Sequence, residues 1–234
     1  MTNKDESSGK RRVWAYALTS VATAIALAGM IVAFVYAQYA VGAILTVLTV
    51  IGALVLAGEI VQDNFYLKSE GLFAARKFDE EKALLERVER NHLFFPFVQE
   101  RYYAIALRNA LARDDLALVK SYIDRLRHVD DRYRHGDGKG IKSGTAYAYI
   151  LILLDEGKYE EARAEYGEFC LENKNYAIYQ TQIEILRALF SRLFGKSDTP
   201  LPPAAIDSPY PVIKRILGRH VEENMGQLHE DWGE

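Results

Sequence analysis

Residues 13–58, VWAYALTSVATAIALAGMIVAFVYAQYAVGAILTVLTVIGALVLAG, contain no charged side chain and no histidine. One membrane-spanning helix needs roughly 20 apolar residues to cross a hydrocarbon core of about 30 Å. A single straight helix over the whole stretch would be about 69 Å long, at ~1.5 Å per residue. We therefore expect two spans, residues 13–37 and 40–61, that break at Gln38 and Tyr39.

Basic residues flank the stretch on both sides, and they predict its orientation. They are Lys10, Arg11 and Arg12 before it, and Lys68, Arg76 and Lys77 after it. Because short basic flanks stay on the cytoplasmic side, we expect an integral membrane protein with two spans. Its N-terminus (residues 1–12) and its large C-terminal part should both be cytoplasmic. A signal peptide cleaved after Ala37 is the rival interpretation, but its apolar region would exceed the usual ~7–15 residues.

The spans are rich in small residues, which let membrane helices approach closely. They are Ala22, Ala24, Ala26, Ala28 and Gly29, then Gly42, Gly52, Ala53, Ala57 and Gly58. The two spans can pack on each other through these residues, or the residues can form a homo-oligomer or contact a membrane partner. The absence of ionisable residues argues against a proton relay or an ion pathway.

The composition limits which functions and which structural features are expected for the part of the chain that follows the spans. Net charge is −3, which gives no electrostatic case for nucleic-acid binding. Cys170 is the single cysteine, so no intrachain disulfide can form. We interpret it as a small buried side chain and not as a nucleophile. Five of the six prolines fall in residues 200–211, which predicts a linker over 196–209.

Apolar residues three and four positions apart predict helix after helix, and no alternating pattern predicts a strand. We therefore expect an all-α fold. Ser208 and Pro209 have the residue types of an N-cap and a first helical position. They predict a capping helix, followed by an acidic tail, within 210–234.

Three segments share a turn, an aromatic residue or leucine, and a helix. They are RKFDEE (76–81), DDLALV (114–119) and GKYEEA (157–162). The third, with Gly157 at the turn, Tyr159 and Ala162, resembles the inter-helix turn and second helix of the tetratricopeptide repeat (TPR). Asp114 and Arg76 stand at the glycine position in the two weaker units, and the spacings of 38 and 43 differ from the family's regular ~34.

The resemblance implies an α-helical-hairpin repeat domain, a TPR-like α-solenoid, over residues 62–195. Its first helix would continue directly from the second span. Such domains bind partners on a concave surface made by the first helix of each pair. In the family's register this surface would carry Tyr66, Arg101, Arg108 and Tyr147, beside Asp63 and Glu70. The two arginines could receive an acidic peptide or a C-terminal carboxylate; alternatively, both pair with helix acids.

The remaining motifs favour neither a nucleotide-binding site, nor a metal site, nor an acid–base pair. GDGKGIKSGT (136–145) lacks the second glycine of a phosphate-binding loop, so we interpret it as a loop in which Ser143 or Thr145 caps the next helix. The histidines and acids of the insertion 128–140 predict a polar loop, or a contact loop, and no metal site. Acids such as Glu81 lie in first helical turns, where they offset the helix dipole.

The sequence thus predicts a membrane-anchored scaffold or adaptor that binds a cytosolic or membrane protein partner. We expect it to have neither enzymatic activity nor a cofactor. The alternative is an accessory subunit of a membrane enzyme, transporter or secretion complex, which it would contact through its spans.

Overall fold

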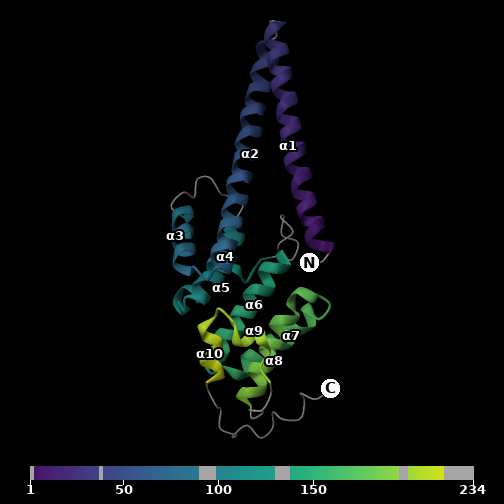
Figure 1. Cartoon of the computed structure of the whole chain (residues 1–234). Coiled ribbons are helices and arrows are strands. Elements are labelled where there is room, and N and C mark those ends of the chain that lie inside the picture. Colours follow the sequence, from purple (N-terminus) through teal and green to yellow (C-terminus); the bar gives the residue numbers. More distant parts are fainter. Residues whose placement is uncertain (1–2, 37–38, 90–98, 130–137, 195–199, 219–234) are drawn as a thin grey trace. The chain divides into compact units, whose positions relative to one another are not determined.

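The computed structural model describes residues 3–36, 39–89, 99–129, 138–194 and 200–218, and side chains from residue 17 onward. Every regular element in these ranges is a helix, so the fold is all-α (Figure 1). The chain divides into two compact units, Met1–Glu70 and Gly71–Glu234. The insertion residues 130–137 and the tail residues 219–234 lie outside the described ranges.

The first unit contains two helices that are long and apolar enough to cross a membrane. Helix α1 (Asn3–Val35) begins well before the predicted span, and α2 (Tyr39–Ala74) runs without a break past its predicted end into the second unit. Large apolar side chains are exposed along both helices, for example Leu18 and Ile25 on α1 and Ile44 and Leu54 on α2. Water would solvate such a surface unfavourably, whereas hydrocarbon would not.

Small residues lie where α1 and α2 meet. A Cβ atom on Gly42 would lie 3.1 Å from the ring of Phe34, and one on Gly52 would lie 2.7 Å from Oγ1 of Thr23. The hydroxyl of Thr23 donates to the carbonyl oxygen of Thr19, 2.8 Å away, so no hydroxyl hydrogen is left unpaired there. These glycines therefore let the two helices approach each other.

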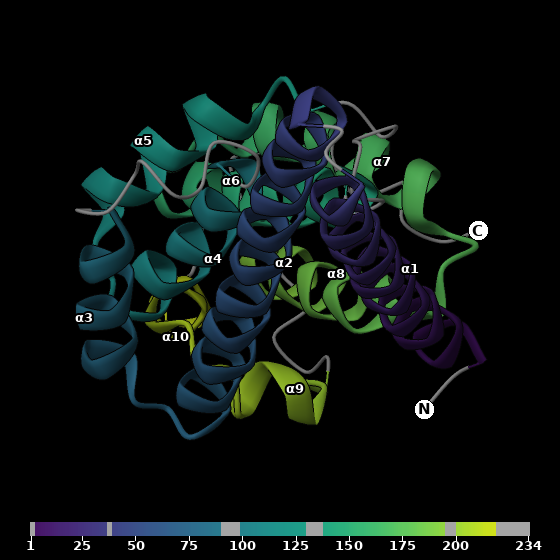
Figure 2. The same cartoon turned by 90° about the horizontal axis from the view of Figure 1, so that it is seen from above.

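The second unit continues with α3 (Phe78–Glu89), α4 (Gln99–Ala112), α5 (Leu116–Leu126), α6 (Gly138–Asp155) and α7 (Tyr159–Asn173). A short 3-10 helix, η2 (Ala177–Tyr179), leads into α8 (Gln180–Leu193), and α9 (Pro203–Ile206) and α10 (Pro211–Leu217) follow. The core has its centre on α6, which packs against α4, α5, α7 and α10 (Figures 1 and 2). Leu151, Leu154, Leu186 and Phe190 are among its fully buried side chains.

The turns at residues 76, 114 and 157, which share a sequence pattern, have the same backbone conformation. Arg76, Asp114 and Gly157 have φ angles of 56°, 60° and 77°, in the left-handed region. In each turn, two consecutive amides donate back to the end of the preceding helix; Gly157 N–H reaches Leu154 O at 3.2 Å, and Lys158 N–H reaches Leu153 O at 2.9 Å. This is the Schellman pattern of helix termination. The next helix starts two residues after each left-handed residue.

The C-terminal segment differs from its prediction. Residues 200–210 include helix α9 and the buried Ala205, so the described part of the predicted linker packs against the domain. The capping helix begins at Pro211, with Tyr210 as N-cap, and the prediction of Ser208 and Pro209 was wrong. The hydroxyl of Ser208 instead accepts a hydrogen bond from the amide of Tyr210 at 3.3 Å, which forms a turn before the helix.

The start of α6 also differs from its prediction. Residues 138–145 form its first turns, so Ser143 and Thr145 lie within the helix and do not cap it. The hydroxyl of Ser143 donates to Oδ1 of Asn173 on α7 at 2.9 Å, and that of Thr145 donates to the Ile141 carbonyl. A helix in this place cannot form a phosphate-binding loop over residues 138–145.

Candidate functional site

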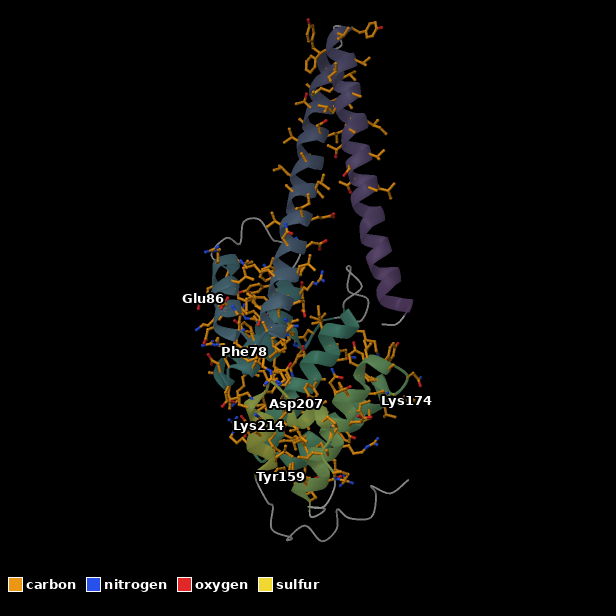
Figure 3. All side chains as sticks on the ribbon, viewed as in Figure 1. Phe78, Glu86, Tyr159, Lys174, Asp207 and Lys214 are labelled. Carbon is orange, nitrogen blue, oxygen red and sulfur yellow. The ribbon has the colours of Figure 1, made fainter. Side chains whose placement is uncertain are left out.

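A pocket of about 470 Å³ opens in the second unit. Its walls come from the end of α2, from α4, from the first half of α6, from η2 and the start of α8, and from Ala204 and residues 208–210. Figure 3 labels Asp207 and Lys214, which lie on either side of the pocket-lining residue Tyr210 in the sequence. Aliphatic and aromatic residues predominate in the lining, among them Phe73, Leu107, Leu111, Ile141, Tyr147, Ile185 and Tyr210. A concave, mostly apolar site with a few polar groups is the usual form of a ligand-binding pocket.

Two of the four predicted site residues line this pocket. Arg108 comes from α4 and Tyr147 from α6, so the fold brings together two side chains from separate helices. Arg101 precedes Arg108 by seven residues on the same face of α4, but it does not line the pocket. Tyr66 belongs to α2 in the first unit, where it is buried and its ring lies edge-on against Phe65.

Arg108 is held in place by a buried carboxylate. Its Nη2 donates to Oε1 of Glu81 at 3.2 Å, and the Glu81 side chain is fully buried. Nδ2 of Asn109 donates to Oε2 of the same carboxylate at 2.8 Å. The guanidinium also lies 4.0 Å above the ring of Phe73, a cation–π contact. Glu81 therefore neutralises the positive charge of Arg108 locally. For this arginine, the structure agrees with the alternative that it pairs with an acid on a neighbouring helix.

Tyr147 supplies the second notable polar group of the pocket. Its side chain is 7% exposed, and its ring packs against Phe169 and Tyr210, with centroids 6.4 and 6.5 Å away. Burial, and then the neighbouring Tyr210, raise the pKa of Tyr147, so its hydroxyl keeps its proton at neutral pH. Among the described residues this hydroxyl makes no hydrogen bond, and its oxygen is not one of their fully buried polar atoms without a partner, so it remains accessible to a ligand in the pocket.

The wall formed by the C-terminal segment is fixed by Arg215 of α10. Its guanidinium donates to both oxygens of Asp114, at 2.6 and 3.0 Å, and to both oxygens of Asp155, each at 2.9 Å. Asp114 is the left-handed residue of the α4–α5 turn, and Asp155 is the last residue of α6. One side chain thus joins α10 to the ends of α4 and α6. Arg76 adds a further contact, donating to the Asp207 carbonyl at 2.6 Å.

The roles of Arg215, Asp155 and Tyr210 were not predicted from the sequence. Asp114 was noticed only because it replaces a glycine in the alignment of the three turns. Its carboxylate, together with that of Asp155, receives an arginine more than fifty positions further along the chain. Tyr210 was missed because it was placed inside the predicted capping helix (210–234), whereas it is the extended residue before that helix and lines the pocket.

A smaller pocket of about 220 Å³ lies between α3, α4 and α5. Tyr102, Tyr103 and Tyr122 line it, and burial raises the pKa of Tyr122. The hydroxyl of Tyr103 accepts from Nη1 of Arg125 at 2.8 Å, and that of Tyr102 donates to the Leu85 carbonyl at 3.3 Å. The hydroxyls of Tyr102 and Tyr103 therefore already have partners within the domain, which favours a packing role for these two residues.

No group of three or more His, Cys, Asp or Glu side chains in the described ranges is arranged to hold a metal ion. Cys170 is half-buried and packs against the core. Comparisons with protein-family models, with curated proteins and with solved structures found no match.

Proposed function

We propose that this protein is a membrane-anchored scaffold or adaptor that binds a protein partner in the pocket between α4, α6 and α8. The observation that carries the proposal is the pocket itself, about 470 Å³ in volume and mostly apolar. Arg108 and Tyr147, which were selected from the sequence as binding residues, both line it. The proposed role is binding, without catalysis.

We also propose that the second unit is a TPR-like arrangement of helical hairpins. The shared conformation of the turns at Arg76, Asp114 and Gly157 supports it. In such an arrangement the first helices of successive pairs would be the end of α2, then α4, α6 and α8. Residues from these four helices line the pocket, which is where the family binds its partners.

The membrane anchor is the second part of the proposal. Helices α1 and α2 would cross the bilayer as a hairpin, because they are apolar over the required length and expose that surface. The basic residues before and after the hairpin favour cytoplasmic positions for both chain termini. The partner would then be recruited to the cytoplasmic face of the membrane.

Site-specific photocrosslinking in intact membranes would test this proposal. Benzoylphenylalanine replaces Thr181, which lines the pocket, in one variant and Leu54, which is exposed on α2, in another. Leu171, exposed on α7 outside the pocket, is the matched control position. An adaptor should crosslink one protein from position 181 and not from 171. Crosslinking from position 54 alone would instead indicate an accessory subunit that binds through its spans.

A further inference from the structure

The charge of the pocket restricts its ligand. Arg108 is the one charged side chain among the pocket-lining residues that the structure describes, and the buried carboxylate of Glu81 neutralises it. An acidic ligand would have to compete with Glu81 for the guanidinium and would separate a buried carboxylate from its counter-charge. Breaking a buried pair in this way is strongly unfavourable. The pocket is therefore unsuited to the acidic peptide that its arginine had suggested.

The hydroxyl of Tyr147 is the polar group of the pocket that can form a hydrogen bond to a ligand. Its side chain is more than nine-tenths buried, it lines the pocket, and within the described residues its hydroxyl makes no hydrogen bond. A single accessible hydroxyl in a mostly apolar wall can fix the orientation of a ligand through one hydrogen bond. Because the hydroxyl keeps its proton, it can donate to a carbonyl oxygen and can also accept from an N–H group.

The chain itself shows what kind of segment packs on this face. One wall of the pocket is a non-helical part of the chain, Ser208, Pro209 and Tyr210, in which Tyr210 has an extended conformation (φ −96°, ψ 110°). The ring of Tyr210 lies against both Tyr147 and Phe73. The open part of the pocket continues this intramolecular interface. A second segment of similar chemistry would extend it.

We infer that the pocket binds an uncharged, extended peptide segment with apolar and aromatic side chains, and that the hydroxyl of Tyr147 makes the polar contact to its backbone. The inference rests on the proposed function, because it specifies the partner of the same site. Apolar side chains of the segment would fill the space between α4 and α8. Arg108 would form part of the wall and would not be the group that recognises the ligand.

A phage-displayed library of random 12-residue peptides, selected on the full chain in lipid nanodiscs, tests this inference. Phage that bind empty nanodiscs are removed first, and the selected peptides are then synthesised and titrated. We expect uncharged peptides rich in apolar and aromatic residues. Replacing one apolar residue of a selected peptide by Asp should weaken its binding at least tenfold, because the new charge has no partner in the pocket.

Two matched variants separate recognition from folding. Tyr147→Phe keeps the ring and removes the hydroxyl, so binding should weaken about tenfold with no loss of thermal stability. Tyr149→Phe makes the same change on α6 outside the pocket, where the ring lies under Arg127, and should leave binding unchanged. Selection of acidic peptides, or unchanged binding by Tyr147→Phe, would overturn the inference and leave the proposed function standing. If no peptide binds above empty nanodiscs, the proposed function itself fails.

Discussion

Arg215 should be a principal stabilising residue of the second unit, although it lies in a short helix near the end of the described chain. Its four hydrogen bonds go to two carboxylates, and each joins charged groups. Arg215→Met keeps most of the aliphatic stem and removes the guanidinium. The carboxylate of Asp155, whose side chain is 8% exposed, then loses the guanidinium while it remains nearly buried.

The size of the effect can be estimated from the exposure of the groups. Breaking a fully buried ion pair costs about 3–5 kcal/mol. The side chains of Arg215 and Asp114 are each about one-third exposed, so solvent screening reduces that figure, and we expect about 2–3 kcal/mol. For a unit of this size, each kcal/mol lowers the midpoint of thermal unfolding by about 2–4 °C. The midpoint should therefore fall by about 5–10 °C.

The assay is thermal unfolding of the full chain in detergent micelles, followed by the near-ultraviolet circular dichroism of its tyrosines. Lys214→Met is the matched control, because Lys214 is the exposed preceding residue of α10 and takes no part in these hydrogen bonds. Adding Asp155→Asn to Arg215→Met should recover part of the loss, because it removes the negative charge that Arg215 had neutralised. Equal midpoints for Arg215→Met and Lys214→Met would refute this account of how the pocket wall is held.

Three further predictions concern local conformation and charge. Gly157→Ala should destabilise the second unit by about 1–2 kcal/mol in urea unfolding, because φ is +77° at this residue. Gly167→Ala, in an exposed stretch of α7, should instead stabilise the unit slightly. The reverse order of stabilities would contradict the assigned turn. Gly52→Ala should lower the fraction of dodecylsulfate at which α1 and α2 lose their packing. The control is Gly58→Ala, whose new Cβ meets no atom within 4 Å. Equal values for the two variants would mean that Gly52 does not lie at the helix contact. Hydrogen bonds from Lys120 and then Lys158 lower the pKa of Glu156. The stabilising contribution of Glu156 is therefore present above about pH 4.5, the ordinary carboxyl value, and is lost as the pH falls through the lowered pKa. Glu156→Gln should flatten the dependence of stability on pH below about 4.5, and an unchanged dependence would contradict this assignment.

Local chain chemistry made much of the helical architecture predictable. The charge-free stretch before Glu59 predicted long apolar helices, and the aligned turns were found through one glycine, Gly157. Arg76 and Asp114 adopt the same left-handed conformation without being glycine. The reason is that each turn is fixed by paired amide hydrogen bonds to the preceding helix, which outweigh the modest cost of a side chain there.

The chemistry of the site was less predictable, because it depends on packing between distant segments. Glu81 was expected to serve the helix dipole in a first turn, yet it is fully buried and pairs with Arg108, 27 positions away. For Arg108 that pairing agrees with the alternative in which the arginines pair with helix acids, and it underlies our proposal of an uncharged ligand. The helix start at Pro211 was missed because Pro209 and Pro211 are equally suited to a first helical position, and only the packing of Tyr210 distinguishes them.

The most direct test of the central claim is to fill the pocket without disturbing the fold. Gly144 lines the pocket on α6, and a Cβ added there meets no atom within 4 Å. Gly144→Leu should therefore occupy space in the pocket while favouring the helix. Gly167→Leu makes the same change on α7, outside the pocket and with equally free space. We predict that Gly144→Leu abolishes crosslinking of the partner from position 181 in membranes and that Gly167→Leu retains it. Equal crosslinking by both variants would contradict the assignment of this pocket as the binding site.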